Sequence, residues 1–153
     1  MRHAHAEPAQ PPLPEAERPL SARGRKQAAS SAARLAAADC VPELLLVSPA
    51  LRTRATAAIV VQALSLQKSC VRYEPELYLA PPATLLAVIR RCPPTVNTLL
   101  ILGHNPGLSE LAHRFDAERT AIDLPTAAVC CLELPGDHWA QLTPHAAPWK
   151  LLS

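Results

Sequence analysis

Apolar residues follow two patterns along the chain, and together the two patterns predict its fold. Continuous apolar runs at residues 41–47 and 98–102 predict strands that are covered on both faces. A shorter strand is expected at residues 69–73. Helical spacing predicts four helices, at residues 22–38, from Pro49 onward, at 82–91 and after Gly103. Strands that alternate with helices form α/β folds, so we expect a three-layer sandwich with a mostly parallel central sheet and helices on both faces.

The same spacing predicts which side each helix buries. After Gly103, apolar residues recur at i, i+3, i+4 and i+7, at Leu108, Leu111, Ala112 and Phe115. In the helix from Pro49, the residues that share one side are Leu51, Ala55, Ala58, Ile59 and Gln62. We expect both helices to pack these sides against the sheet.

Two further segments complete the expected single domain, which spans residues 1–153. Residues 7–19 contain five prolines and predict a loop, because proline lacks a backbone donor and disfavours helix in the residue before it. Residues 127–134 and 138–142 predict a C-terminal β-hairpin that turns at Pro135-Gly136-Asp137.

The composition argues against several classes of protein. A formal net charge of +2, without a run of lysine or arginine, argues against a nucleic-acid partner. No stretch approaches the roughly 20 apolar residues of a membrane span, so we expect no membrane partner. The five cysteines show no C-x-x-C pair and no metal-ligand spacing. With no signal peptide, they predict reduced thiols in a cytoplasmic protein without a metal site.

Three short basic segments carry the candidate chemistry. Arg2-His3 begins the chain, Ser48 to Arg52 follows one predicted strand, and Gly103-His104-Asn105-Pro106 follows another. Because α/β folds bind ligands beyond the carboxyl ends of their parallel strands, we expect these segments to meet. Two arginines and two histidines at such a place predict a pocket for a phosphoryl group, in which one imidazole attacks phosphorus.

Each residue of the predicted pocket has a role and a plainer alternative. His3 is the candidate nucleophile, or else an exposed histidine near a frayed terminus. Arg2 and Arg52 are expected to bind phosphoryl oxygens, and an arginine in a first helical turn is easier to explain beside a bound anion. His104 and Asn105 are expected to bind phosphate at a helix N-terminus, although a histidine in a tight turn is often structural.

A carboxylate of the chain is a candidate for the general acid of the reaction. Phosphatases that release an alcohol normally use an acid to protonate the leaving oxygen. Glu76 is the best-placed carboxylate by its order along the chain, and a solvated loop glutamate is the alternative. A leaving imidazole needs such an acid less, because the nitrogen–phosphorus bond is labile.

Four motifs resemble those of the histidine phosphatase superfamily, the phosphoglycerate mutase-like clan. Arg2-His3-Ala4 resembles its Arg-His-Gly or Arg-His-Ala signature, and residues 18–24 resemble the segment before its first helix. Residues 48–57 resemble its second arginine motif, and residues 102–106 resemble its second histidine motif. The short length, the Gly-His-Asn-Pro sequence and the closing hairpin are most similar to the SixA-type phosphohistidine phosphatases.

The resemblance implies a pocket of Arg2, His3, Arg52 and His104, with His3 phosphorylated during turnover and with no metal or organic cofactor. It also implies a phosphohistidine-bearing partner protein, either a phosphotransfer domain or a phosphocarrier, and we expect a monomer. Two alternatives stay open. One is a phosphatase of a small phosphorylated metabolite, which would need Glu76 as a real acid. The other is a catalytically silent module that binds phosphorylated partners.

The chain departs from the family at its front. Relatives begin with a short apolar strand before Arg-His, whereas only Met1 precedes Arg2 here, so we expect the first strand to be missing from this chain. Each backbone group left unpaired in a core costs about 1–3 kcal/mol, and over a strand the sum rivals a domain's stability of roughly 5–15 kcal/mol. A chain without this strand is expected to fold poorly or to lack activity.

Overall fold

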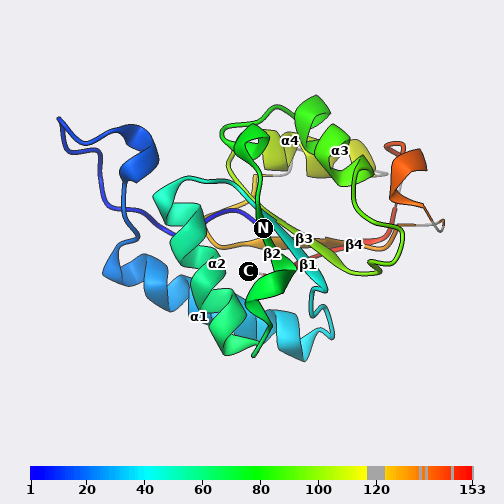
Figure 1. The fold of residues 1–153 in the computed structure, drawn as a ribbon, viewed down its shortest axis with the longest axis horizontal. Coiled ribbons are helices and arrows are strands. Elements are labelled where there is room, and N and C mark those ends of the chain that lie inside the picture. Colours follow the sequence, from blue (N-terminus) through cyan, green and yellow to red (C-terminus); the bar gives the residue numbers. More distant parts are fainter. Residues whose placement is uncertain (117–122, 135, 137, 146, 153) are drawn as a thin grey trace.

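The computed structural model describes residues 1–116, 123–134, 136, 138–145 and 147–152, and it shows the predicted α/β fold. A central parallel sheet has the strand order β2-β1-β3, formed by Val71–Tyr73, Leu44–Val47 and Leu99–Leu102. Two helices cover each face of this sheet (Figure 1). On one face lie α1 (Ala22–Ala37) and α2 (Leu51–Ala63), and on the other lie α3 (Pro82–Arg90) and α4 (Gly107–Phe115).

Short 3-10 helices connect these elements in the part of the chain that the structure describes. They are η1 (Glu15–Glu17), η2 (Lys68–Cys70), η3 (Pro75–Leu77) and η4 (Trp139–Gln141). Within the same residues, no helix is both long and apolar enough to cross a membrane.

β1 shows why a continuous apolar run becomes the central strand. Leu44 and Leu46 belong to the apolar cluster beneath α3 and α4, and Leu45 and Val47 belong to the cluster beneath α1 and α2. Successive side chains of a strand point to opposite faces, so a strand between two helical layers must be apolar at every position. All four residues of β1 are buried, as the prediction requires.

The buried side of α4 was predicted correctly, but the side predicted for α2 is only partly buried, through Ala55 and Ile59. Leu51, Ala58 and Gln62 are exposed, and the buried residues of α2 are Arg52, Thr53, Thr56, Ala57 and Val60. The buried hydroxyls are satisfied by the backbone. Thr53 Oγ1 donates to the Ser48 carbonyl at 2.7 Å, and Thr56 Oγ1 accepts the amide of Ala4 at 3.1 Å. The polar side of α2 is therefore the side that packs on the N-terminal segment.

α1 also packs closely on the N-terminal segment. Its N-cap is Ser21, whose Oγ accepts the amide of Gly24 at 3.0 Å. A Cβ at Gly24 would overlap the carbonyl oxygen of His5. Glycine in this first turn, which is weak in helix propensity, thus allows the helix to approach residues 1–6.

The C-terminal hairpin exists, but its second strand was placed too early. β4 (Val129–Leu132) pairs antiparallel with β5 (Trp149–Leu152), with Val129 opposite Leu152. The segment predicted as the partner, residues 138–142, contains η4 instead, where Trp139 Nε1 donates to the Val96 carbonyl at 2.7 Å. Pro135 and Asp137, which belong to the predicted turn, lie outside the described residues.

Residues 1–3 connect the two sheets. His3 N donates to the Gly103 carbonyl at 3.0 Å and Gly103 N donates to the Met1 carbonyl at 3.2 Å, so the segment runs parallel beside the end of β3. On its other side, Arg2 N donates to the Ala128 carbonyl at 3.1 Å, and Ala127 N donates to the His3 carbonyl at 3.1 Å. These three residues stand where the resemblance places the end of a first strand.

A cavity of about 550 Å³ lies next to Met1 between the edges of β3 and β4. Its lining includes residues of both strands, among them Leu100, Ile101, Cys130 and Leu132. The Met1 amino group donates to the Ile101 carbonyl at 2.7 Å, so the segment reaches only this far along β3. A further extended segment in this cavity would lie between β3 and β4 and could pair with the edges of both strands.

Four apolar residues, Val-Leu-Val-Val, added before Met1 are expected to fill this cavity and raise the free energy of unfolding by about 1–4 kcal/mol. Burying each side chain stabilises by about 1.5–3 kcal/mol, and ordering each backbone residue costs about 1–2 kcal/mol. Urea denaturation measures the difference, with a Ser-Gly-Ser-Gly extension of equal length as the control. Equal stability of the two extended chains would contradict the expectation.

Candidate active site

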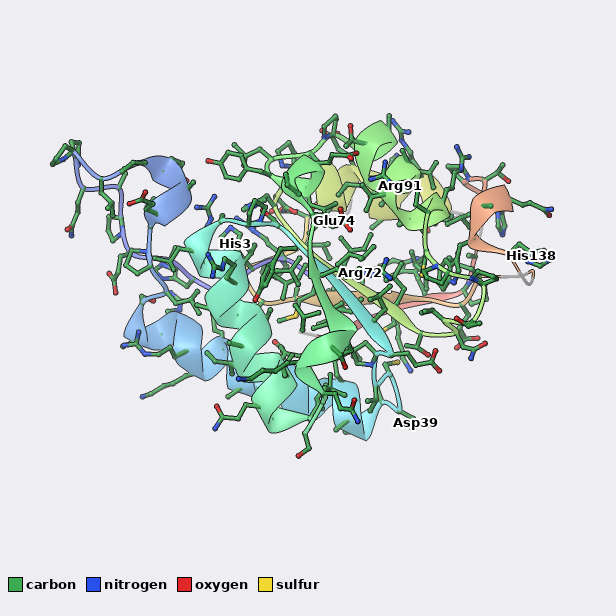
Figure 2. All side chains as sticks on the ribbon, in the orientation of Figure 1. His3, Asp39, Arg72, Glu74, Arg91 and His138 are labelled. Atoms are coloured by element: carbon green, nitrogen blue, oxygen red, sulfur yellow. The ribbon has the colours of Figure 1, made fainter. Side chains whose placement is uncertain are left out.

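The three basic segments meet at the carboxyl ends of the parallel strands. Ser48 follows β1, His104 stands just after β3, and Arg2 forms a bridge with Gly103. Figure 2 shows His3 beside the N-terminal end of α2, whose first turn contains Arg52. The topology of the sheet therefore gathers residues that are far apart in the sequence.

Arg52 joins the two histidines of the pocket. Its Nε donates to His3 Nε2 at 3.3 Å, and its Nη2 donates to His104 Nδ1 at 3.3 Å. The two imidazole rings have centroids 5.2 Å apart. Arg52 is only 2% exposed, so these bonds form away from water, where charge-assisted hydrogen bonds are stronger.

The tautomer of His3 is fixed by its two ring contacts. Nδ1 lies 2.8 Å from the carbonyl oxygen of Ala4, which can only accept a hydrogen bond, so Nδ1 carries the proton. Nε2 lies against Arg52, which can only donate, so Nε2 carries the lone pair. The nitrogen that faces the pocket is therefore the nucleophilic one.

His104 has the opposite tautomer by the same reasoning. Nδ1 accepts from Arg52, so Nε2 carries the proton and donates to Ser48 Oγ at 2.7 Å. The ring of Tyr78 packs edge-on against His104 at a centroid distance of 5.5 Å. Both His104 and Ser48 are buried, which fixes the orientation of this imidazole.

Burial and positive charge keep both imidazoles neutral. Burial, and then the charges of Arg52, Arg2 and Arg18, lower the pKa of His3 from 6.5 to about 4, although its bond to Ala4 opposes this. Burial, and then the charge of Arg52, lower the pKa of His104 from 6.5 to about 3. A neutral His3 at physiological pH keeps on Nε2 the electron pair that attack on phosphorus requires, and in this structure Arg52 donates a hydrogen bond to that pair.

The pocket also contains two residues that sequence reasoning missed, Glu15 and Arg18. Arg52 Nη1 donates to the Glu15 carbonyl at 2.8 Å, and its Nη2 lies 3.4 Å from the Glu15 carboxylate. Arg18 Nη1 binds the same carboxylate at 2.8 Å and 3.1 Å. Both residues belong to the proline-rich segment, which was predicted only as a loop. The bridge between Ala6 and Leu20, which brings this segment back to the site, has no local sequence signal.

Arg2 and Asn105 converge on a single carbonyl group. Arg2 Nη1 donates to the Leu124 carbonyl at 2.8 Å, and Asn105 Nδ2 donates to the same oxygen at 3.0 Å. Asn105 Nδ2 also donates to Asp123 Oδ1 at 3.1 Å. Asn105 was expected to bind phosphate, and in the structure its side-chain amide hydrogens hold residues 123–124 beside the pocket.

Glu76 is not brought to the pocket. It lies on η3 with an exposed side chain, and its carboxylate pairs with Arg91 Nη2 at 3.0 Å. Figure 2 shows Arg91 well separated from His3. The structure thus gives Glu76 the position of a solvated surface glutamate, which was the plainer alternative.

The arrangement has the chemistry of a phosphoryl-binding site. Arg2, Arg18 and Arg52 supply positive charge and planar donors around the lone pair of His3. Such donors neutralise the charge that develops on phosphoryl oxygens during transfer. Within the described ranges, no three histidine, cysteine or acidic side chains are grouped so that they can hold a metal ion.

The lowered pKa values of His3 and His104 predict acid sensitivity. Between pH 6.5 and about 4 the unfolded chain binds protons at these positions that the folded protein does not, so stability is full above pH 6.5 and falls as the pH drops. We expect a loss of about 2–4 kcal/mol from this pair between pH 7 and 4.5. The measurement is the free energy of unfolding as a function of pH.

The double variant His3→Asn/His104→Asn should flatten this pH dependence, and His138→Asn should not. His138 is exposed and lies far from His3 in Figure 2. An unchanged slope in the double variant would contradict the assignment.

Comparison with known sequences agrees with this geometry. A family model described as histidine phosphatase superfamily (branch 1) matches residues 1–77. An uncharacterized protein of Mycobacterium tuberculosis is 33% identical over 157 residues, which cover 96% of this chain and 94% of the relative.

Comparison with solved structures points the same way. The Nakamurella multipartitia protein assigned as phosphohistidine phosphatase SixA matches with a TM-score of 0.83 and 26% identity, covering 100% of this chain and 92% of its own. The protein histidine phosphatase SixA complexed with tungstate matches with a TM-score of 0.76 and 25% identity, covering 100% and 94%. The pocket, the fold and these matches together place the chain in the histidine phosphatase superfamily, among proteins similar to its SixA-type members.

Proposed function

We propose that this phosphatase hydrolyses phosphohistidine carried by a partner protein, through a phosphorylated His3. The observation that carries the proposal is the lone pair of His3 Nε2, held by Arg52 inside a pocket of guanidinium groups. A nucleophile alone would suit many reactions, but a nucleophile surrounded by anion-binding groups suits phosphoryl transfer.

The reaction has two steps on the same nitrogen. In the first, His3 Nε2 forms a bond to phosphorus, and the bond from phosphorus to the substrate imidazole breaks. The electron pair of that bond stays on the leaving ring, whose other nitrogen carries a proton before transfer, so the ring leaves as neutral imidazole. The Nδ1 proton of His3 remains bound to the Ala4 carbonyl, which stabilises the positive charge on the phosphorylated ring. In the second step water forms a bond to phosphorus, and the Nε2–phosphorus bond breaks. The electron pair returns to Nε2, and a water proton passes to the released phosphate.

The carboxylates near the site favour a leaving imidazole over a leaving alcohol. Glu76 pairs with Arg91 at the surface, and the carboxylate of Glu15 is held between two guanidinium groups as their counter-ion. Neither is placed to protonate a leaving oxygen, and the carboxylate of Asp123 beside the pocket accepts a hydrogen bond from Asn105 Nδ2. A small phosphorylated metabolite, the main alternative, would need such an acid. The solved SixA structures to which the chain is similar support the same choice.

Exposed apolar residues around the pocket favour a substrate carried by a protein. Leu51 precedes Arg52 and is 41% exposed, and Leu79 follows Tyr78 and is 54% exposed. Leu13, in the same segment as Glu15, is 40% exposed. Large apolar side chains that lie in water beside a polar site are typical of protein interfaces. A phosphotransfer domain or a phosphocarrier offers the surface that would cover them.

The variant His3→Gln should release no phosphate from a histidine-phosphorylated phosphotransfer domain, and the parent chain should release it with a chelator present. The loss follows because glutamine offers no lone-pair nitrogen of comparable nucleophilicity. The readout is free phosphate, together with acid-labile, base-stable label on the enzyme. His5→Gln is the matched control, because His5 lies two residues on and bonds to Ser21 instead.

Phosphate release by His3→Gln at the parental rate would exclude His3 as the nucleophile. A fall of at least tenfold in phosphate release by Glu76→Gln would show that Glu76 acts as the general acid, and it would favour the small phosphorylated metabolite as substrate. A folded parent chain that binds the phosphorylated domain without turnover would establish the silent binding module.

Arg52→Ala should weaken the binding of inorganic phosphate at least tenfold, whereas Arg54→Ala should change it less than twofold. A hydrogen bond to a charged group contributes about 1.5–3 kcal/mol, which corresponds to roughly 10–150-fold in affinity. Arg54 lies two residues on in the same helix, exposed over the ring of Tyr73. Calorimetric titration gives both dissociation constants, and equal losses in the two variants would contradict the pocket.

A further inference from the structure

The guanidinium groups beside His3 already bind an anion of the chain itself. The Glu15 carboxylate lies 3.4 Å from Arg52 Nη2, and its two oxygens accept hydrogen bonds from Arg18 Nη1 at 2.8 Å and 3.1 Å. After burial, the charges of Arg52 and Arg18 are among the causes that lower the pKa of His3, so both charges act at the candidate nucleophile. Carboxylates and phosphoryl groups offer guanidinium groups the same kind of charged oxygen. Glu15 therefore occupies donors that also suit a phosphoryl group.

The Nη2 group of Arg52 is the donor for which the two anions would compete. A guanidinium binds an anion with two parallel hydrogen bonds along one of two edges, Nε with Nη2 or Nη1 with Nη2, so both edges use Nη2. In this structure Nη2 donates to His104 Nδ1 at 3.3 Å and forms the ion pair with Glu15. A phosphoryl group that binds Arg52 through either edge must displace one of these two partners.

The Glu15 carboxylate is the partner that can leave. His104 is 3% exposed, and its imidazole is also held by Ser48 Oγ. The side chain of Glu15 is 46% exposed, so it can turn into water at little cost. Arg52 Nη1 donates to the Glu15 carbonyl at 2.8 Å, which keeps the backbone of η1 beside the start of α2 (Figure 1). The carboxylate thus stays within reach of the site after it has left it.

We propose that the phosphoryl group and the Glu15 carboxylate exchange on Arg52 Nη2, and that the returning carboxylate displaces phosphate when the reaction ends. The inference rests on the proposed function for its substrate, and it names how the same site is emptied. One anion replaces another, so the buried guanidinium keeps a counter-ion throughout. The exchange forms and breaks ion pairs and hydrogen bonds only. Because Glu15 is tethered to the site, it limits inhibition by the phosphate that turnover produces.

Glu15→Gln should bind inorganic phosphate at least fivefold more tightly than the parent chain. Glutamine has nearly the same size and leaves the backbone contact with Arg52 in place, but it lacks the charge that competes for the guanidinium groups. Calorimetric titration with inorganic phosphate gives the two dissociation constants. Added phosphate should also inhibit hydrolysis of a phosphohistidine protein at least fivefold more strongly in this variant.

The matched control is Glu17→Gln, which changes the net charge by the same amount on the same 3-10 helix. Glu17 is exposed, and the Arg52 guanidinium binds Glu15 instead. Its affinity for phosphate should change less than twofold. Glu15→Ala is a second variant without the carboxylate and should also bind phosphate more tightly than the parent. Since the expected result is a gain of affinity, a poorly folded variant cannot imitate it.

Three results would overturn the inference. Weaker or unchanged phosphate binding in both Glu15 variants would make Glu15 a residue that positions Arg52. An equal gain in Glu17→Gln would assign the effect to net charge. Tighter binding in Glu15→Gln without stronger inhibition by phosphate would remove the displacement of product. The binding measurement needs no turnover, so a parent chain that hydrolyses no phosphohistidine would remove the proposed function, while the exchange on Arg52 is still decided by the titrations.

Discussion

The buried guanidinium of Arg52 is the group on which the pocket depends. A buried charge is tolerated only when its hydrogen bonds are satisfied, and here the partners are two neutral imidazoles and the backbone and carboxylate of Glu15. The same bonds hold the lone pairs of His3 Nε2 and His104 Nδ1 toward the guanidinium of Arg52. A phosphoryl group would therefore meet donors that already converge. Preparing the nucleophile and preparing the anion site are thus one structural arrangement.

Much of the fold could be predicted because a strand buried on both faces and a helix buried on one face have different patterns of apolar residues in the sequence. β1 and β3 lie within the predicted apolar runs, and α4 buries the predicted residues. The side of α2 was mispredicted because Thr53 and Thr56 are buried through hydrogen bonds to the backbone, which polarity alone does not indicate. β5 was missed because strand pairing is decided by tertiary contacts and not by the distance along the chain.

The site was predictable as a set of residues but not as a set of contacts. Sequence order and strand ends were enough to expect that His3 and His104 would face each other. The direction of the Asn105 amide depends on Leu124, and the position of Glu15 depends on how a proline-rich segment folds back. Neither contact has a local pattern. Sequence reasoning therefore names the candidate nucleophile more readily than it names the groups that balance charge around it.

The hydrogen bonds that hold residues 2 and 3 have a consequence for the order in which the protein becomes active. Arg2 and His3 are the first residues of the pocket to be synthesised, yet they are bonded to Ala128 and Ala127, about 125 residues further along the chain. At about 5–20 residues per second, His3 is synthesised roughly 6–25 s before those partners exist. The nascent chain thus carries His3 without the assembled pocket, and the pocket can form only after residues 127 and 128 have been added.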